Sequence, residues 1–158
     1  PNTVAALPAG NHLGLDGAGV RINLNDSGLD PHPDLAGRIL NMPPPPADTV
    51  GHGTHVAGIL AGDGSMSASV TGTNLPGSFV PPVPGQFRGM APASELFWQP
   101  VSLTLGAFFS SDELIQQGAA RTNALVSNNS WGYVASYGYD LAAASYDDAL
   151  AADKSLPN

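Results

Sequence analysis

The sequence predicts an α/β fold in which a mostly parallel central sheet is flanked by helices. Three segments have the pattern of a short strand, and each is followed along the chain by a segment with the pattern of a helix. Strands that alternate with helices pair in parallel, and the helices then cover the faces of the sheet. In such sheets ligands gather outside the carboxyl ends of the strands, so we expect a functional site at that edge.

The strand segments are short apolar runs that end at turn-forming residues. In the first, Val20, Ile22 and Leu24 occupy alternate positions, and the run stops at Asp26-Ser-Gly, which places Asp26 at the carboxyl end of a strand. The second and third are "ASELFWQPV", residues 93–101, and "ALVSNNSWG", residues 124–132.

The helical segments follow the strands in turn. Residues 54–61 are mostly small and apolar, which favours a helix that packs closely. Residues 110–123 begin with Ser110 and Glu113 at the spacing of a capping box. Residues 139–154 form the last predicted helix, begun by Asp140.

Residues 62–88 are too rich in Gly, Pro, Ser and Thr for a regular element and too long for an ordinary connection. We interpret them as an insertion on the scaffold. No linker divides the rest of the chain, so residues 1–158 are predicted to belong to one domain.

The composition excludes several classes of partner. With 13 acidic and 5 basic side chains the net charge is −8, which offers no electrostatic footprint for nucleic acid or anionic lipid. The absence of cysteine excludes disulfides, thiol nucleophiles and zinc ribbons. No apolar run approaches the length that crosses a membrane.

The stretch "GHGTHVAGIL" places His52 and His55 three residues apart at the start of a predicted helix. A carboxylate on one imidazole nitrogen holds the tautomer whose other nitrogen accepts a proton, and Asp26 at the neighbouring strand end is suited to that role. Asp26 could instead cap a turn. A metal site on the two histidines is disfavoured because the H-E-x-x-H glutamate and a third ligand are lacking. We expect His55 to be a packed, hydrogen-bonded support of the helix.

Four motifs in this order, "NDSGLDPHPDL", "GHGTHVAGIL", "RGMAPASELF" and "SNNSWG", resemble the subtilisin-like serine proteases, the subtilases, and are most similar to their bacterial Asn-Ser-Trp-Gly branch. The resemblance implies a three-layer subtilisin-like fold, incomplete in this chain. It also implies that Asp26 orients the base and that His52 is the general base.

The same resemblance implies a substrate-binding edge at Ser130, Trp131 and Gly132, where main-chain hydrogen bonds hold an extended peptide. Trp131 could instead be a packed aromatic residue. A second edge is expected at Ala107, Phe108 and Phe109, although the two phenylalanines could equally lie in the core. No cofactor is required for the chemistry.

Asp34, in "HPDL", corresponds to a family position that often binds structural calcium, but a turn role is the stronger interpretation because the insertion replaces the companion loop.

Subtilases also need an oxyanion-holding Asn and a nucleophilic Ser in a Gly-Thr-Ser segment, and no serine of this chain has that context. We therefore expect an N-terminal half of a catalytic domain, inactive alone, that acts on peptides or proteins together with a C-terminal part carrying the Ser and the Asn. Extracellular location follows from the resemblance. A non-catalytic peptide-binding module and a purely structural domain are the alternatives.

Overall fold

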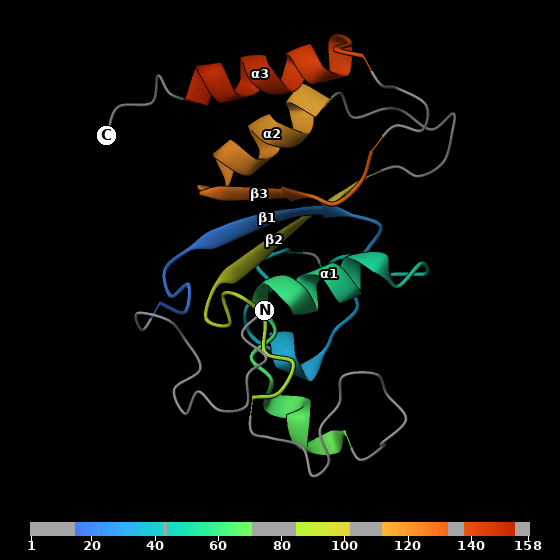
Figure 1. The fold of residues 1–158 in the computed structure, drawn as a ribbon, viewed down its shortest axis with the longest axis vertical. Coiled ribbons are helices and arrows are strands. Elements are labelled where there is room, and N and C mark those ends of the chain that lie inside the picture. The colour runs from blue at the N-terminus through green and yellow to red at the C-terminus, as the bar shows by residue number, and fades with distance from the viewer. Residues whose placement is uncertain (1–14, 43, 71–84, 102–111, 133–137, 154–158) are drawn as a thin grey trace.

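The computed structural model describes residues 15–42, 44–70, 85–101, 112–132 and 138–153. It contains a parallel sheet of three strands, β1 (Arg21–Asp26), β2 (Glu95–Pro100) and β3 (Val126–Asn129), in the order β2-β1-β3. Helix α1 (His52–Ala61) lies on one side of this sheet, and α2 (Asp112–Arg121) and α3 (Leu141–Asp153) lie on the other (Figure 1). The predicted α/β fold with a parallel sheet between helices is confirmed.

The face of the sheet that meets α1 is apolar. Ile22 and Leu24 of β1 and Leu96 of β2 are at most 4% exposed, and they pack against Val56 and Ala57 of the helix. Burial of such side chains contributes about 1.5–3 kcal/mol each, so this contact holds α1 firmly to the central strand.

The opposite face of the sheet, toward α2, is polar. Asn23 and Asn25 alternate with the apolar residues of β1 and are fully buried. The Gln99 side-chain amide of β2 donates to Asn23 Oδ1 at 2.7 Å and to the main-chain oxygen of Ile115 in α2 at 2.9 Å. Asn25 Nδ2 donates to Asn129 Oδ1 at 2.6 Å. Side-chain hydrogen bonds therefore connect all three strands to the helix layer.

The two edges of the sheet differ. Beyond β2, the main chain around Ile39 forms a parallel bridge with Leu96, supported by the bond from Leu40 N to Leu96 O at 2.9 Å. On the far side of β3 no further strand pairs among the described residues. No strand in the described ranges pairs with the N–H and C=O groups along that edge, and such groups can pair with another strand.

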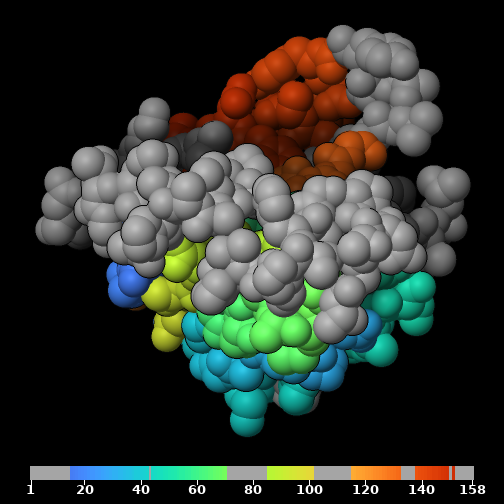
Figure 2. All heavy atoms as spheres, turned by 60° about the horizontal axis from the view of Figure 1, so that its bottom comes forward, coloured from blue at the N-terminus to red at the C-terminus, as the bar shows by residue number. Residues whose placement is uncertain are grey.

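Two short 3-10 helices, η2 (Pro33–Leu35) and η3 (Ser65–Ser69), lie against each other below α1. In Figure 2 the green atoms of η3 lie on blue and cyan atoms of the segments that precede α1. Helix η3 lies inside the predicted insertion, where no regular element was expected. It forms because Asp63 Oδ1 accepts from Ser65 N at 2.8 Å and Asp34 Oδ1 from Met66 N at 2.7 Å.

Helix α3 begins where the sequence predicts it. Asp140 accepts a hydrogen bond from Ala143 N on its carboxylate, at 3.0 Å, and one from Ala144 N on its main-chain oxygen. This arrangement satisfies two of the donors that a helix N-terminus leaves free. The predicted capping box of α2 involves Ser110, which lies outside the described residues.

No described helix is long and apolar enough to cross a membrane.

Candidate active site

Asp26 is the last residue of the central strand, and β2 and the residue after β2 hold its main chain in place. Its main-chain oxygen accepts from the Trp98 indole Nε1 at 3.1 Å and from Val101 N at 3.2 Å. Its carboxylate is 3% exposed. A buried carboxylate needs hydrogen-bond donors or a cationic partner, so the groups that face it decide its role.

His52 is the first residue of α1, and a glycine brings that end of the helix close to Asp26. A Cβ atom at Gly53 would lie 2.1 Å from the main-chain oxygen of Gly28 and 3.1 Å from Asp26 Oδ1. Only glycine permits this approach without a shift of the backbone. The N-terminus of α1 therefore sits directly on the carboxyl end of β1, with His52 beside Asp26.

The two side chains are in contact. Nδ1 of His52 lies 2.7 Å from Oδ1 of Asp26. An ionised carboxylate can only accept, so Nδ1 donates its hydrogen, and Nε2 keeps a lone pair. The histidine side chain is 49% exposed whereas the aspartate is almost fully buried. The arrangement is an imidazole base held from behind by a buried carboxylate.

The two oxygens of Asp26 are used unequally. Oδ1 accepts from Ser27 N at 2.8 Å as well as from His52. Oδ2 is buried, and no donor of the described residues reaches it. The hydrogen bonds that the described residues make to this carboxylate therefore all end on Oδ1, the oxygen that contacts the imidazole.

A second buried carboxylate, Asp48, lies behind this pair, and sequence reasoning did not find it. Its Oδ2 accepts from Thr54 N at 2.7 Å, and its Oδ1 accepts from Gly51 N at 3.0 Å and from Ser27 Oγ at 2.8 Å. Burial alone would raise the pKa of Asp48, but the hydrogen bonds from Thr54, Ser27 and Gly51 lower it to about 2. An aspartate a few residues before a glycine-initiated helix was the signal available in the sequence.

The sign of this shift fixes the pH range in which Asp48 stabilises the protein. The folded-state pKa, about 2, lies below the ordinary value of 3.8. The ionised carboxylate therefore makes its full contribution to the free energy of unfolding above about pH 4. That contribution is lost as the pH falls through the folded-state pKa.

The predicted substrate edge follows β3 directly. Ser130 and Gly132 are exposed, whereas Trp131 is half-buried. The Trp131 ring lies 6.3 Å, centroid to centroid, from the Tyr146 ring of α3, with the planes at 51°. This contact agrees with the packed-aromatic interpretation of the Trp131 side chain. The role of the main chain as a substrate edge stays a prediction, and Ala107, Phe108 and Phe109 lie outside the described residues.

Asp34 connects η2 to η3. Its Oδ1 accepts from Met66 N at 2.7 Å and from Ser65 Oγ at 2.9 Å. Among the described residues no three His, Cys, Asp or Glu side chains are placed to hold a metal ion. These contacts support the turn interpretation, and calcium binding at Asp34 stays a prediction.

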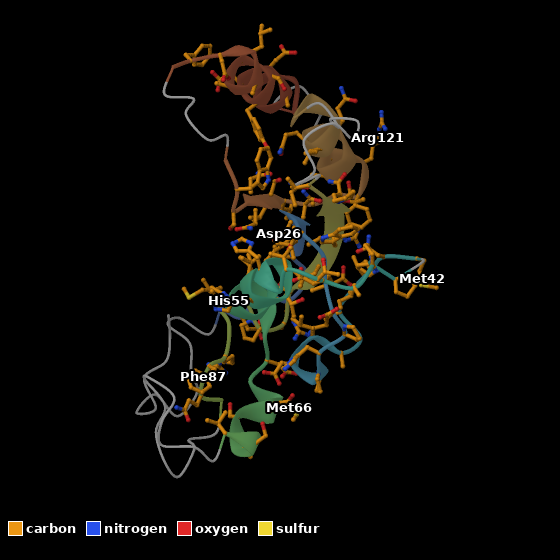
Figure 3. All side chains as sticks on the ribbon, turned by 90° about the vertical axis from the view of Figure 1, so that its right-hand side faces the viewer. Asp26, Met42, His55, Met66, Phe87 and Arg121 are labelled. Carbon is orange, nitrogen blue, oxygen red and sulfur yellow. The ribbon has the colours of Figure 1, made fainter. Side chains whose placement is uncertain are left out.

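His55 differs from its prediction. It was expected to be packed and hydrogen-bonded, but it is exposed and lies on the side of α1 that faces away from the sheet (Figure 3). The reason is the helical period: Val56 and Ala57 face the core, so His55 and Ile59 face outward. His55 lines a groove of about 590 Å³ with Ile59, Phe87 and Met90.

Comparison with known proteins shows the family of this chain. A sequence model of the subtilase family matches residues 17–155. The chain belongs to the subtilase family. Two relatives are the serine protease AprX of Bacillus subtilis (strain 168), 39% identical over 88 residues, and subtilisin Savinase of Lederbergia lenta, 45% identical over 58 residues.

The fold agrees with this membership. The crystal structure of MycP1 with its N-terminal propeptide removed is similar, with a TM-score of 0.56 and 24% sequence identity. The match covers 88% of this subtilase chain and 40% of the MycP1 chain. The AprX match covers 52% of this chain and 16% of AprX, and the Savinase match covers 34% and 22%. The chain thus spans less than half the length of each of these three proteins.

Proposed function

We propose that this chain supplies the aspartate and histidine of a subtilisin-type serine endopeptidase. The observation that carries the proposal is the 2.7 Å contact between His52 Nδ1 and Asp26 Oδ1, with the imidazole half-exposed and the carboxylate buried. This is the geometry that a general base and its orienting carboxylate require. Membership of the subtilase family supports it.

In the proposed reaction, a serine hydroxyl from residues outside this chain attacks the carbonyl carbon of the scissile peptide bond. His52 Nε2 takes the hydroxyl proton and later gives it to the leaving amine, as the C–N bond breaks and an acyl-enzyme forms. Water then hydrolyses the acyl-enzyme, with His52 again accepting a proton. Asp26 stays ionised and stabilises the imidazolium. No cofactor takes part.

The substrate is a peptide or protein chain in extended conformation. The exposed main chain at Ser130 and Gly132 is suited to bind it by β-strand addition. Ala107, Phe108 and Phe109 are proposed as a second edge on the resemblance alone.

The partner of this chain is proposed to be the rest of the catalytic domain, which carries the nucleophile and the oxyanion-holding Asn. The edge of β3, which no described strand pairs, supports this proposal because an unpaired parallel strand favours the addition of another. The small share of each relative that the chain spans supports it too. Alone, residues 1–158 are expected to lack triad-based hydrolysis. The complete protein is proposed to be extracellular.

A peptide-binding module without catalysis is the second candidate, because the exposed edge at Ser130 and Gly132 does not depend on a nucleophile. Micromolar binding of an extended peptide, with no turnover by the complete protein, would favour it.

The test compares two histidines of the same helix in the complete protein. With a fluorogenic peptide substrate, His52→Ala is expected to lower kcat/KM by at least about 10⁴-fold, since triad members act as a unit. His55→Ala is the matched control: His55 is exposed, so activity should stay unchanged and the free energy of unfolding should move by less than about 0.5 kcal/mol. Loss of activity in His55→Ala with activity retained in His52→Ala would overturn the assignment.

A further inference from the structure

The Asp48 carboxylate accepts hydrogen bonds from both segments that carry the candidate catalytic pair, the end of β1 and the start of α1. Ser27, which donates to Asp48 Oδ1, directly follows Asp26 in the chain. Gly51 and Thr54, whose N–H groups donate to the same carboxylate, lie on either side of His52. Asp48 is only 6% exposed. One buried anion therefore joins the end of β1 to the start of α1.

We propose that Asp48 is a positioning residue, which, through the Ser27 hydroxyl, keeps the His52 imidazole against Asp26 with its hydrogen on Nδ1. The inference deepens the proposed function and rests on it. It gives a role to a residue that neither touches substrate nor belongs to the predicted pair.

The Ser27 hydroxyl has one hydrogen and two carboxylates within reach. Its Oγ lies 2.8 Å from Asp48 Oδ1 and 3.3 Å from Asp26 Oδ1. The hydrogen goes to the nearer acceptor, since a hydrogen bond at the longer distance is much weaker. A lone pair of the same oxygen accepts from Gly53 N at 3.1 Å. Asp26 Oδ1 is thus left to Ser27 N and to His52.

Without the negative charge at residue 48, the Ser27 hydroxyl no longer has a preferred acceptor in that side chain. The Ser27 hydroxyl would turn to Asp26 Oδ1 and compete with the His52 N–H for the same oxygen. The N–H groups of Gly51 and Thr54 would also lose a charged acceptor, which loosens the first turn of α1. Both effects weaken the bond that selects the Nδ1–H tautomer of His52.

The ionisation of Asp48 fits this role. Its pKa, about 2, keeps the carboxylate charged throughout the pH range in which an imidazole is neutral and acts as a base. The orientation of the Ser27 hydroxyl is therefore the same at every pH at which the site can work.

The experiment is nitrogen NMR of the imidazole ring of His52, which distinguishes a protonated from a bare ring nitrogen. In the complete protein the wild type is expected to carry the hydrogen on Nδ1. In Asp48→Asn the fraction with the hydrogen on Nδ1 should fall at least about twofold. In Ser27→Ala/Asp48→Asn the fall should be smaller than in Asp48→Asn alone, because no hydroxyl is left to turn toward Asp26.

Asp63→Asn is the matched control. Asp63 also accepts a main-chain N–H, from Ser65 at 2.8 Å, but it is exposed and lies just before η3, so its replacement should leave His52 unchanged. Should Asp48→Asn fail to fold, Asp48→Ser removes the charge and keeps a short acceptor for the helix N–H groups, with the same result expected.

An Asp48 variant that folds with reduced stability but an unchanged His52 tautomer would overturn the inference, because a merely structural role predicts that outcome. The readout does not depend on hydrolysis. Peptide hydrolysis absent from the complete wild-type protein would refute the proposed function, even with the tautomer behaving as expected.

Discussion

At the scale of single residues, the site depends on a few atoms that glycine and aspartate place. Asp26 and His52 meet because Gly53 lets the helix reach the strand end, and the contact is 2.7 Å between nitrogen and oxygen. The motifs were enough to predict this pair, since they combine a strand-ending carboxylate with a helix-starting imidazole. The position of Asp48 before the helix could be noticed in the sequence, but its hydrogen bond with Ser27 could not be predicted, because that bond depends on the fold of the loop before α1.

Gly53→Ala tests the close approach directly. The added methyl group would meet the main-chain oxygen of Gly28 at 2.1 Å, a rigid neighbour, so we expect a loss of at least about 2 kcal/mol in the free energy of unfolding. Gly58→Ala is the control in the same helix. Nothing lies within 4 Å of its added Cβ, so it should stabilise by about 0.5–1 kcal/mol. Urea unfolding measures both, and equal effects of the two substitutions would contradict the account.

At the scale of elements, the strand pattern predicted the position of β1 and its apolar face. It did not predict what the polar face of β1 contacts. The apolar positions Ile22 and Leu24 face α1 as an alternating strand should. Asn23 and Asn25, which alternate with these apolar residues, are polar, as on a strand face that meets solvent. In the structure both are fully buried, on the side of the sheet where α2 lies. Sequence could not show this, because the polar groups are satisfied by residues far along the chain, Gln99 and Asn129 among them.

The exposure of His55 has a similar origin. Its motif indicated a packed residue, but the helical period turns it away from the core and into the groove beside Phe87 (Figure 3). Which face of α1 is buried depends on where the sheet lies, and the local sequence does not contain that information.

Asn129→Ala tests the polar layer. Asn129 Oδ1 accepts from Asn25 Nδ2 at 2.6 Å and from the Tyr146 hydroxyl at 3.3 Å. Its loss takes the short acceptor from the buried Asn25 amide, which keeps only the longer bond to Ser127 Oγ at 3.3 Å. We expect destabilisation of about 1–3 kcal/mol in denaturant unfolding. Asn128→Ala, one position earlier, removes only an exposed bond to Ser130 and should cost less than about 0.5 kcal/mol. If Asn128→Ala lowers the free energy of unfolding as much as Asn129→Ala does, the buried polar layer does not stabilise the fold as described.

At the scale of the whole molecule, the structure combines the His52–Asp26 contact with a sheet edge that is unpaired among the described residues. The α1 side of the sheet has a closed apolar core, and the far edge of β3 has no strand partner among the described residues. Relatives that extend well beyond the matched region fit a site completed by further chain. The order of strands and helices was predictable from the hydrophobic pattern, since local periodicity encodes it, whereas the packing of α2 against a polar face, and of α3 against α2, was not.

The central claim is that Asp26 orients His52 for peptide hydrolysis, and the most direct measurement is the kcat of the complete protein carrying Asp26→Asn. The substitution preserves shape, but its amide offers a donor where the carboxylate accepted, which favours the wrong imidazole tautomer. We predict a fall in kcat of about 10⁴-fold with little change in KM. A variant that folds and hydrolyses peptide within tenfold of the wild type would contradict the account.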